Sequence, residues 1–281
     1  MCKSNRDLQT TVRGSFTLHG VGIHSGKSVA VTVHPAQAGG IRFVRADQPD
    51  VTIKAEVHAV QDTPRCTVLA AGKVRIATTE HLLAAFWALG IDHALVTVDG
   101  AELPILDGSA VEFVHAIEQV GVQALDAARA PLCLAAPAWV QSGNAHILAV
   151  PAEGLRVTYV LEYPHPQVGV QTVSVAITPD AFAESIAPAR TFGFVEWAEE
   201  LRARGLALGA SPENTVVITQ EGTLTPLRFP DELVRHKILD LLGDLALLGR
   251  PLHAHILALR SGHAANAALV RRILAQTVPE A

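Results

Sequence analysis

Cysteine, clustered basic residues and long apolar runs are all scarce in this sequence. The three cysteines, Cys2, Cys66 and Cys133, lie far apart without a C-x-x-C spacing, so a zinc site built from cysteine is disfavoured. The 22 basic residues are scattered among 27 acidic ones, which disfavours a nucleic-acid or anionic-membrane surface. The longest apolar run, LLAAFWALGI at 82–91, is too short to span a bilayer.

The N-terminal residues, MCKSNRDLQTTVRGS, also contain no apolar segment of the kind that secretory signals require. We therefore expect a cytoplasmic protein without stable membrane insertion. Hydrophobic residues make up 49% of the 281 positions and charged residues only 17%. Such a chain is too apolar to be disordered, and it is long enough to form one or two domains.

Alternating apolar and polar residues predict strands in the first part of the chain, separated by turns, at 15–26, 27–36, 40–46, 51–60, 66–78 and 93–100. A helix is expected to follow the hairpin at 66–78, because Thr78 or Thr79 can cap it and Gly90 can end it. A second helix is predicted over 111–120.

The alanine- and proline-rich segment LDAARAPLCLAAPA interrupts this pattern, and we place a domain boundary near residue 128. Both halves run from strands to a long helix that carries a histidine, and then to a strand and another helix. The sequence therefore predicts an α+β protein of two domains, 1–128 and 129–281, each an antiparallel sheet covered on one face by helices. If the helical layers face each other, the histidine-bearing helices meet between the domains, where pockets tend to form.

Two of these helices carry residues suited to a zinc hydrolase, which needs three protein ligands and a carboxylate that is not a ligand. His236 and Asp240 are four residues apart and share one helix face. His81 heads the first helix, and Glu80 beside it can act as the base. A solvent-exposed helix edge explains the first pair equally well, and an acid at a helix N-terminus is favoured without any function.

The segment RSGH, at 260–263, stands where a strand should give way to a loop. His263 can be an ordinary helix cap at this strand-to-helix turn. It can also be a general acid on a flexible loop, with Asp244 close enough to orient its imidazole or favour its protonation. The sequence alone leaves both interpretations open.

Several segments together resemble the UDP-3-O-acyl-N-acetylglucosamine deacetylase family of Gram-negative bacteria, which commits this sugar nucleotide to lipid A synthesis. They occur in order as GVGIHSGK, TTEHLLAA, LPILDGSA, ARTFGF, VRHKILDLLGD and SGHAAN, and the resemblance extends from about residue 10 to residue 275. It implies a zinc-dependent hydrolase that removes the N-acetyl group. It also implies two βααβ-type domains, each with a small insert, and helices sandwiched between two sheets.

The resemblance assigns catalytic roles to individual residues. The zinc ion would be held by His81, His236 and Asp240. Glu80 would be the general base, and His263, paired with Asp244, would be the general acid or an electrostatic stabiliser. Thr191 would help to hold the oxyanion.

Substrate contacts are implied in the same way. Phe192 would pack on the sugar, Lys237 would meet the diphosphate, and Tyr163 would stack on the uracil. An insert at about 193–215 would shape a hydrophobic passage for the acyl chain. Its apolar residues include Phe194, Val195, Leu201, Leu206 and Ala207.

The sequence departs from the family pattern at Ala145 and Arg260, where the family often has lysine. Two other interpretations therefore stay open. A related zinc deacetylase could act on a different N-acylated sugar nucleotide, which Ala145 favours, or the chain could be a non-catalytic sugar-nucleotide-binding protein of the same fold. Glu80 and His263 argue against the second, because binding alone needs no general base. We expect a small-molecule substrate, no nucleic-acid partner and a monomer.

Two common catalytic motifs are excluded. GVGIHSGKS invites a phosphate-loop interpretation, but a strand-like segment, VAVTVHP, follows it, whereas a phosphate loop opens a helix. No G-x-S-x-G segment occurs, so a serine hydrolase would lack its nucleophile elbow.

Overall fold

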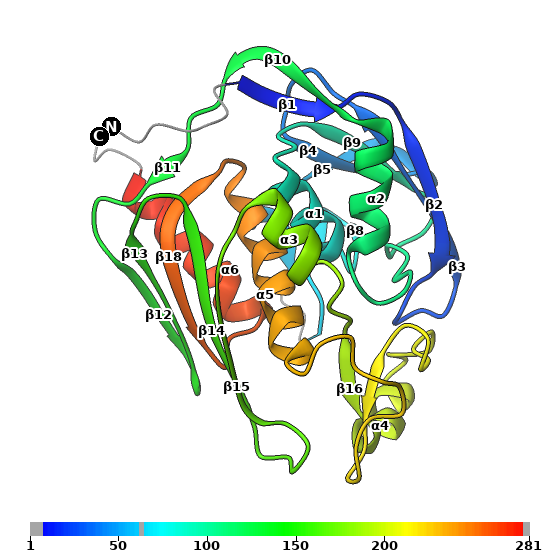
Figure 1. Cartoon of the computed structure of the whole chain (residues 1–281). Helices are drawn as coiled ribbons and strands as arrows, with labels where there is room; N and C mark the ends of the chain where they lie inside the picture. Colours follow the sequence, from blue (N-terminus) through cyan, green and yellow to red (C-terminus); the bar gives the residue numbers. More distant parts are fainter. Residues whose placement is uncertain (1–7, 62–64, 278–281) are drawn as a thin grey trace.

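The computed structural model describes residues 8–61 and 65–277. Two large sheets enclose a layer of helices (Figure 1). The first sheet has the strand order β2-β3-β9-β4-β5. Its strands are β2 (Phe16–Val21), β3 (Ser28–Pro35), β9 (Ala94–Val98), β4 (Ile41–Arg45) and β5 (Gln48–Lys54).

The second sheet has the order β12-β13-β18-β14-β15, with a short β11 beside β18. Its strands are β11 (Leu132–Cys133), β12 (Ala138–Ser142), β13 (Ala145–Pro151), β18 (Leu252–Leu259), β14 (Leu155–Tyr163) and β15 (Gly169–Ala176). The predicted boundary near residue 128 falls between the two sheets. We propose that each sheet and its helices form one domain.

Neither sheet is wholly antiparallel, so this part of the prediction is wrong. In the first sheet β4 and β9 are parallel, and in the second β14 is parallel to β18, as is β11. Parallel neighbours need a long crossover connection. The chain supplies one in each half, because α1 (Glu80–Leu89) lies between β4 and β9 and α5 (Glu232–Leu245) lies between β14 and β18.

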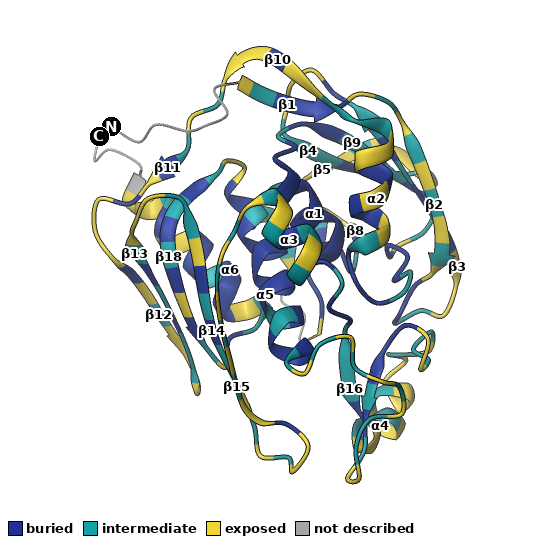
Figure 2. Ribbon diagram, viewed as in Figure 1, coloured by how far each residue is buried: buried dark blue, intermediate teal, exposed yellow. Residues whose placement is uncertain are grey.

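The helices α1 and α5 pack against each other in the centre of the molecule, and both are almost entirely buried (Figure 2). α2 (Val111–Val120) and α3 (Pro179–Ser185) contact α1, and α6 (His263–Thr277) contacts α5. The short α4 (Ala198–Ala203) lies apart from this layer (Figure 1). Short 3₁₀ turns occur at Val57–Ala59, Val195–Trp197 and Ala246–Leu248. Within α1 only Trp87 is not fully buried. Each fully buried leucine of this layer contributes about 1.5–3 kcal/mol of hydrophobic stabilisation.

The predicted ends of α1 are confirmed, although the cap differs in detail. Gly90 follows the helix in the left-handed region, with φ of 76°, where glycine is favoured. Thr79 stands at the N-cap, but its hydroxyl donates to the carbonyl oxygen of Thr67, at 3.2 Å, instead of accepting from the helix. This bond ties α1 to the preceding hairpin. The predicted second helix corresponds to α2, which ends before Gly121.

Three small sheets complete the fold. The hairpin segment forms β6 (Val60–Gln61), β7 (Val68–Ala71) and β8 (Val74–Ile76). In the second half β16 (Phe192–Phe194) pairs in parallel with β17 (Val216–Ile218), and α4 lies in the connection between them. β1 (Leu8–Val12) pairs antiparallel with β10 (Val122–Ala128). In the part of the chain that the structure describes, no helix is long and apolar enough to cross a membrane.

Candidate active site

Three side chains with metal-binding atoms meet where α1 packs on α5. His81 comes from α1, whereas His236 and Asp240 lie one turn apart on α5. All three are buried, and their potential ligand atoms lie within 4.8 Å of one another. Oδ1 of Asp240 is 3.4 Å from Nε2 of His236 and 3.8 Å from Nε2 of His81. The sequence argument that brought these helices face to face therefore holds.

The surroundings of these side chains suit a divalent cation. Burial holds the pKa of His81 at about 3 and also lowers the pKa of His236, so both imidazoles are neutral and can act as ligands at neutral pH. Nδ1 of His81 is buried and has no hydrogen-bond partner among the described residues. A buried polar group without a partner is unfavourable. Two neutral imidazoles and a carboxylate match the donors that zinc accepts in hydrolases.

Neighbouring groups orient two of the three candidate ligands. Nδ1 of His236 donates to the carbonyl oxygen of Ala189, at 3.0 Å, which leaves Nε2 facing Asp240. Nζ of Lys237 lies 2.6 Å from Oδ2 of Asp240 and leaves Oδ1 facing the histidines. Burial alone would raise the pKa of Asp240, but the Lys237 ammonium holds it well below its usual range. The carboxylate is therefore ionised.

Glu80 lies beside this group in a position to exchange a proton. Its Oε2 accepts a hydrogen bond from the backbone N–H of Thr67, at 3.0 Å, and its Oε1 lies 4.0 Å from Nε2 of His263. The side chain is buried, and burial raises the pKa of Glu80 to about 7. A carboxyl group with a pKa near the working pH can both accept and return a proton.

His263 begins α6, and its imidazole is held by Asp244 from α5. Its Nδ1 lies 2.9 Å from Oδ2 of Asp244, and the amide of Asn266 donates to the same oxygen at 2.8 Å. The hydroxyl of Thr67 donates to the other oxygen of Asp244. Burial alone would lower the pKa of His263, but the Asp244 carboxylate raises it to about 9. The imidazole therefore carries a proton at neutral pH. Glu80, Asp240 and His263 also form a second group with metal-ligand spacing.

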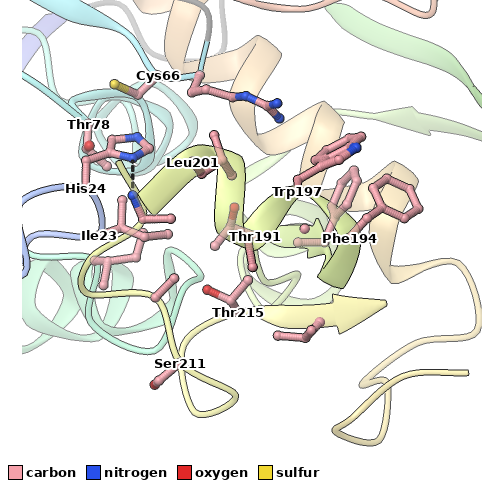
Figure 3. Close-up of a pocket in the computed structure, with 18 of the residues that line it drawn as sticks. Ile23, His24, Cys66, Thr78, Thr191, Phe194, Trp197, Leu201, Ser211 and Thr215 are labelled. Atoms are coloured by element: carbon pink, nitrogen blue, oxygen red, sulfur yellow. Dashed lines mark hydrogen bonds between the residues drawn. The ribbon is translucent and has the colours of Figure 1, made fainter. Parts of the chain in front are cut away.

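A cavity of about 370 Å³ opens onto these residues. Figure 3 shows another part of its lining, which includes Ile23, Thr191 and Trp197. Glu80, His81, His236, Asp240 and His263 are all part of its lining. The rest of its wall is mainly apolar and comes from both halves of the chain. The apolar lining includes Ile23, Ile105, Val195, Trp197, Leu201 and Val217. A cluster of polar groups in a mainly apolar wall is typical of a site for an amphipathic ligand.

Some of the residues expected to contact substrate line the cavity, and others do not. Thr191, Phe192, Phe194 and Ala207 line the cavity. Lys237, by contrast, does not line it and is paired with Asp240. Two further residues also lie outside the lining, Tyr163 and Leu206. The ring of Tyr163 packs in an aromatic cluster with Phe192 at 6.0 Å, Phe194 at 5.1 Å and Trp197 at 6.2 Å between centroids.

The sequence analysis missed several residues that shape the site. Glu102 is buried and accepts hydrogen bonds from the backbone N–H groups of His24 and Ser25, at 2.8 and 2.9 Å. The loop that it holds in turn supports the insert, since the N–H of Leu208 donates to the carbonyl oxygen of His24. Glu102 directly precedes LPILDGSA, but a single acidic residue in a predicted turn gives no reason to expect a buried side chain. Thr67 has no sequence signal either.

A missed ion pair fixes the segment that carries Thr191, just before β16. The guanidinium of Arg190 pairs with the fully buried carboxylate of Glu232 at the start of α5, with a distance of 2.8 Å from Nε to Oε1. The backbone N–H of Arg190 donates to the same oxygen at 3.0 Å. The segment that carries Ala189 and Thr191 is therefore tied to the helix that carries His236.

Known proteins are similar to this chain over nearly its whole length. The family model described as UDP-3-O-acyl N-acetylglycosamine deacetylase matches residues 9–275. A protein of Leptospira biflexa named UDP-3-O-acyl-N-acetylglucosamine deacetylase is 40% identical over 270 residues, which covers 95% of this chain and 89% of the relative. Proteins with the same name from Thermosynechococcus vestitus and Nitratidesulfovibrio vulgaris are 44% and 43% identical, covering 96% and 94% of this chain and 95% and 87% of the relatives. The family predicted from the motifs is thus confirmed, and the chain belongs to the UDP-3-O-acyl N-acetylglycosamine deacetylase family.

Proposed function

We propose that this protein is a zinc-dependent hydrolase that removes the N-acetyl group from UDP-3-O-acyl-N-acetylglucosamine in lipid A biosynthesis. It would act on this small-molecule substrate in the cytoplasm as a monomer. The observation that carries the proposal is the meeting of His81, His236 and Asp240 beside Glu80 in the lining of a mainly apolar cavity. Membership of the family supports the same substrate.

The proposed roles follow from the chemistry of the donors. His81, His236 and Asp240 would hold the zinc ion, which when bound acts as a Lewis acid that polarises the amide carbonyl and lowers the pKa of water. Lys237 would keep Asp240 ionised and turned toward the two histidines. The backbone carbonyl of Ala189 would fix the tautomer of His236.

Proton transfer would use Glu80 and His263, which lie beside the proposed ligands. Glu80 would take a proton at Oε1 from the attacking water as the water oxygen bonds to the acetyl carbon. Thr191 would stabilise the developing oxyanion. Nε2 of His263 would then give its proton to the amide nitrogen as the C–N bond breaks. The products are acetate and the free amine of the sugar nucleotide, so the atoms of one water and one amide are accounted for.

A non-catalytic role is less well supported by these contacts. A binding protein would gain nothing from a buried carboxyl group whose pKa is raised to about 7 beside a protonated histidine. Perturbed titratable groups that converge on a cavity favour catalysis. We therefore prefer the hydrolase to a sugar-nucleotide-binding protein of the same fold.

The proposal is tested by turnover of UDP-3-O-acyl-N-acetylglucosamine before and after removal of metal. Purified protein should release acetate and a free amine, lose this activity after dialysis against a chelator, and regain it with about one zinc ion per chain. The double variant H81A/H236A should contain no stoichiometric zinc. Full zinc occupancy in this variant would contradict the ligand assignment.

A second candidate is a zinc deacetylase for another N-acylated sugar nucleotide. Ala145, at the start of β13, replaces a lysine that often contacts the nucleotide in the family that the chain resembles. Comparing turnover of acylated substrates that differ only in the nucleotide would decide between the two. Equal or faster turnover with a different nucleotide would favour this alternative.

A further inference from the structure

The carboxylate of Glu102 joins part of the cavity wall to the segment that leads into α1. Its Oε1 accepts hydrogen bonds from the backbone N–H of His24, at 2.8 Å, and from the hydroxyl of Thr78, at 3.2 Å. Its Oε2 accepts one from the backbone N–H of Ser25, at 2.9 Å. The side chain is buried, and three donors from two separate segments of the chain fix its position.

The loop between β2 and β3, which contains His24, forms a seam with the insert. The N–H of Leu208 donates to the carbonyl oxygen of His24, at 3.1 Å, and the N–H of Gly209 donates to that of Ile23, at 3.0 Å. A methyl group on Gly209 would overlap the carbonyl oxygen of Gly22, so the two backbones are in close contact. The seam therefore joins the two halves of the chain through backbone groups.

The seam is also part of the cavity wall. Ile23, His24 and Ala207 line the cavity, and Nδ1 of His24 accepts a hydrogen bond from the N–H of Ala207, at 3.4 Å (Figure 3). Under the proposed function, the acyl chain of the substrate lies against the wall that the insert provides. A chain in contact with the seam takes its position from it, so the place of the seam relative to Glu80 decides where the acetyl group lies.

Thr78 connects the same carboxylate to the proposed base. It lies two residues before Glu80 and has a φ of 58°, which is unfavourable for a β-branched residue. Such a conformation persists only where the surrounding structure holds it. The hydroxyl of Thr78 donates to Glu102, and backbone hydrogen bonds join Ala77 to the residues on either side of Glu102. Glu102 therefore holds the segment before Glu80 as well as the seam.

We propose that Glu102 is a positioning residue that keeps the seam in register with Glu80, so that a bound acyl chain places the acetyl group correctly for hydrolysis. This inference rests on the proposed function. Glu102 does not line the cavity, so it acts through the seam and Thr78 and not through contact with substrate. A misplacement of about 1 Å at a reacting centre can cost about 10²-fold in rate.

The substitution E102Q tests this role. The amide keeps the size of the side chain but replaces one acceptor oxygen with a donor, which cannot accept from the backbone of the loop. For a substrate with a long acyl chain, kcat should fall about tenfold further than for one with a 3-O-acetyl group, and KM should stay within about twofold of the wild-type value. Both substrates are assayed on one preparation, so a loss of folded or zinc-loaded protein lowers both kcat values equally and leaves their ratio unchanged.

A second variant breaks the seam without changing Glu102. G209A places a methyl group against the carbonyl oxygen of Gly22 and should lower the ratio of the two kcat values in the same direction. The control is G14A, whose added carbon would lie at an ordinary 3.7 Å from Val120 and should leave the ratio at the wild-type value. An unchanged ratio in either E102Q or G209A, or a rise in KM alone, would overturn the role of Glu102. A wild-type protein that hydrolyses neither substrate would instead overturn the proposed function.

Discussion

Glu80 and His81 are neighbours in sequence, but their side chains lie in different surroundings. His81 faces His236 and Asp240, whereas Glu80 faces the backbone of Thr67 and the ring of His263. An acid in the first turn of a helix could serve only to stabilise the helix dipole. That explanation fits an exposed side chain better than one that is 3% exposed. The proposed roles of base and ligand follow from this difference.

The substitution E80Q separates these roles. The amide keeps the size of the side chain but cannot accept a proton, so turnover should fall by about 10²-fold or more while zinc stays bound. Turnover of the acylated substrate and zinc content by elemental analysis are measured on the same preparation. E112Q, also a first-turn glutamate of a helix but in α2, provides the control. A Glu80 that only caps its helix would leave the rate near the wild-type value.

The raised pKa values of Glu80 and His263 predict a bell-shaped dependence of kcat/KM on pH. Glu80 must be deprotonated to act as a base, so activity should rise as the pH increases through its pKa of about 7. A bound cation favours the carboxylate, so in the metal-loaded protein this rise should occur at lower pH. His263 must be protonated to act as an acid, so activity should fall as pH rises through about 9. In H263A the basic limb should disappear. Its persistence would assign that limb to another group.

At the scale of elements, the contact between α1 and α5 depends on one glycine. Gly243 lies against the backbone of Glu80, and a methyl group there would overlap the Glu80 carbonyl oxygen. G243A should therefore push the helices apart, lower the free energy of unfolding by about 1–3 kcal/mol and reduce turnover as Glu80 moves. Denaturant unfolding and turnover measure the two effects. G14A is the control, since its added carbon would lie 3.7 Å from Val120. Full activity in G243A would show that this close contact does not position Glu80.

Local signals made the helices predictable, but not the contacts that orient their side chains. Gly90 follows α1 and was read from the sequence, because a left-handed residue after a helix is a local requirement. The bond between Thr67 and Glu80 joins residues 13 apart, and the one between Ala189 and His236 spans 47. Both use a backbone group, which carries no residue-type signal. The pairing of Lys237 with Asp240 was readable from their i, i+3 spacing and was overlooked.

At the scale of the whole molecule, the similarity of the two halves predicted where the site would form. Each half places a histidine on a helix that faces the other half, so the proposed reacting centre needs residues from both halves. The parallel strand pairs were not predicted, because alternation along a strand does not reveal the direction of its neighbour. The insert between β16 and β17 extends the cavity away from this centre, and its wall comes from residues far apart in sequence.

The apolar wall of the cavity predicts how kcat/KM depends on the acyl chain of the substrate. Each methylene buried in the cavity is worth about 0.8 kcal/mol, so removing the 3-O-acyl chain should lower kcat/KM by several orders of magnitude as remote binding energy is lost. Narrowing the wall should penalise long chains more than short ones. Ala207 is poorly suited to this test, because its φ of 55° would strain a bulky replacement.

Two alanines of α4 offer a matched comparison. Ala198 lines the cavity, whereas Ala203, on the same helix, is exposed and does not. A198F should therefore reduce kcat/KM for a long acyl chain by about tenfold more than for a short one, equivalent to the loss of about two buried methylenes. A203F should leave the ratio of kcat/KM for long and short chains at the wild-type value, because Ala203 does not line the cavity. Steady-state kinetics with a series of acyl lengths measure both ratios. Equal turnover of UDP-N-acetylglucosamine with and without the acyl chain by the wild type would mean that the insert is only part of the core and that the chain binds elsewhere.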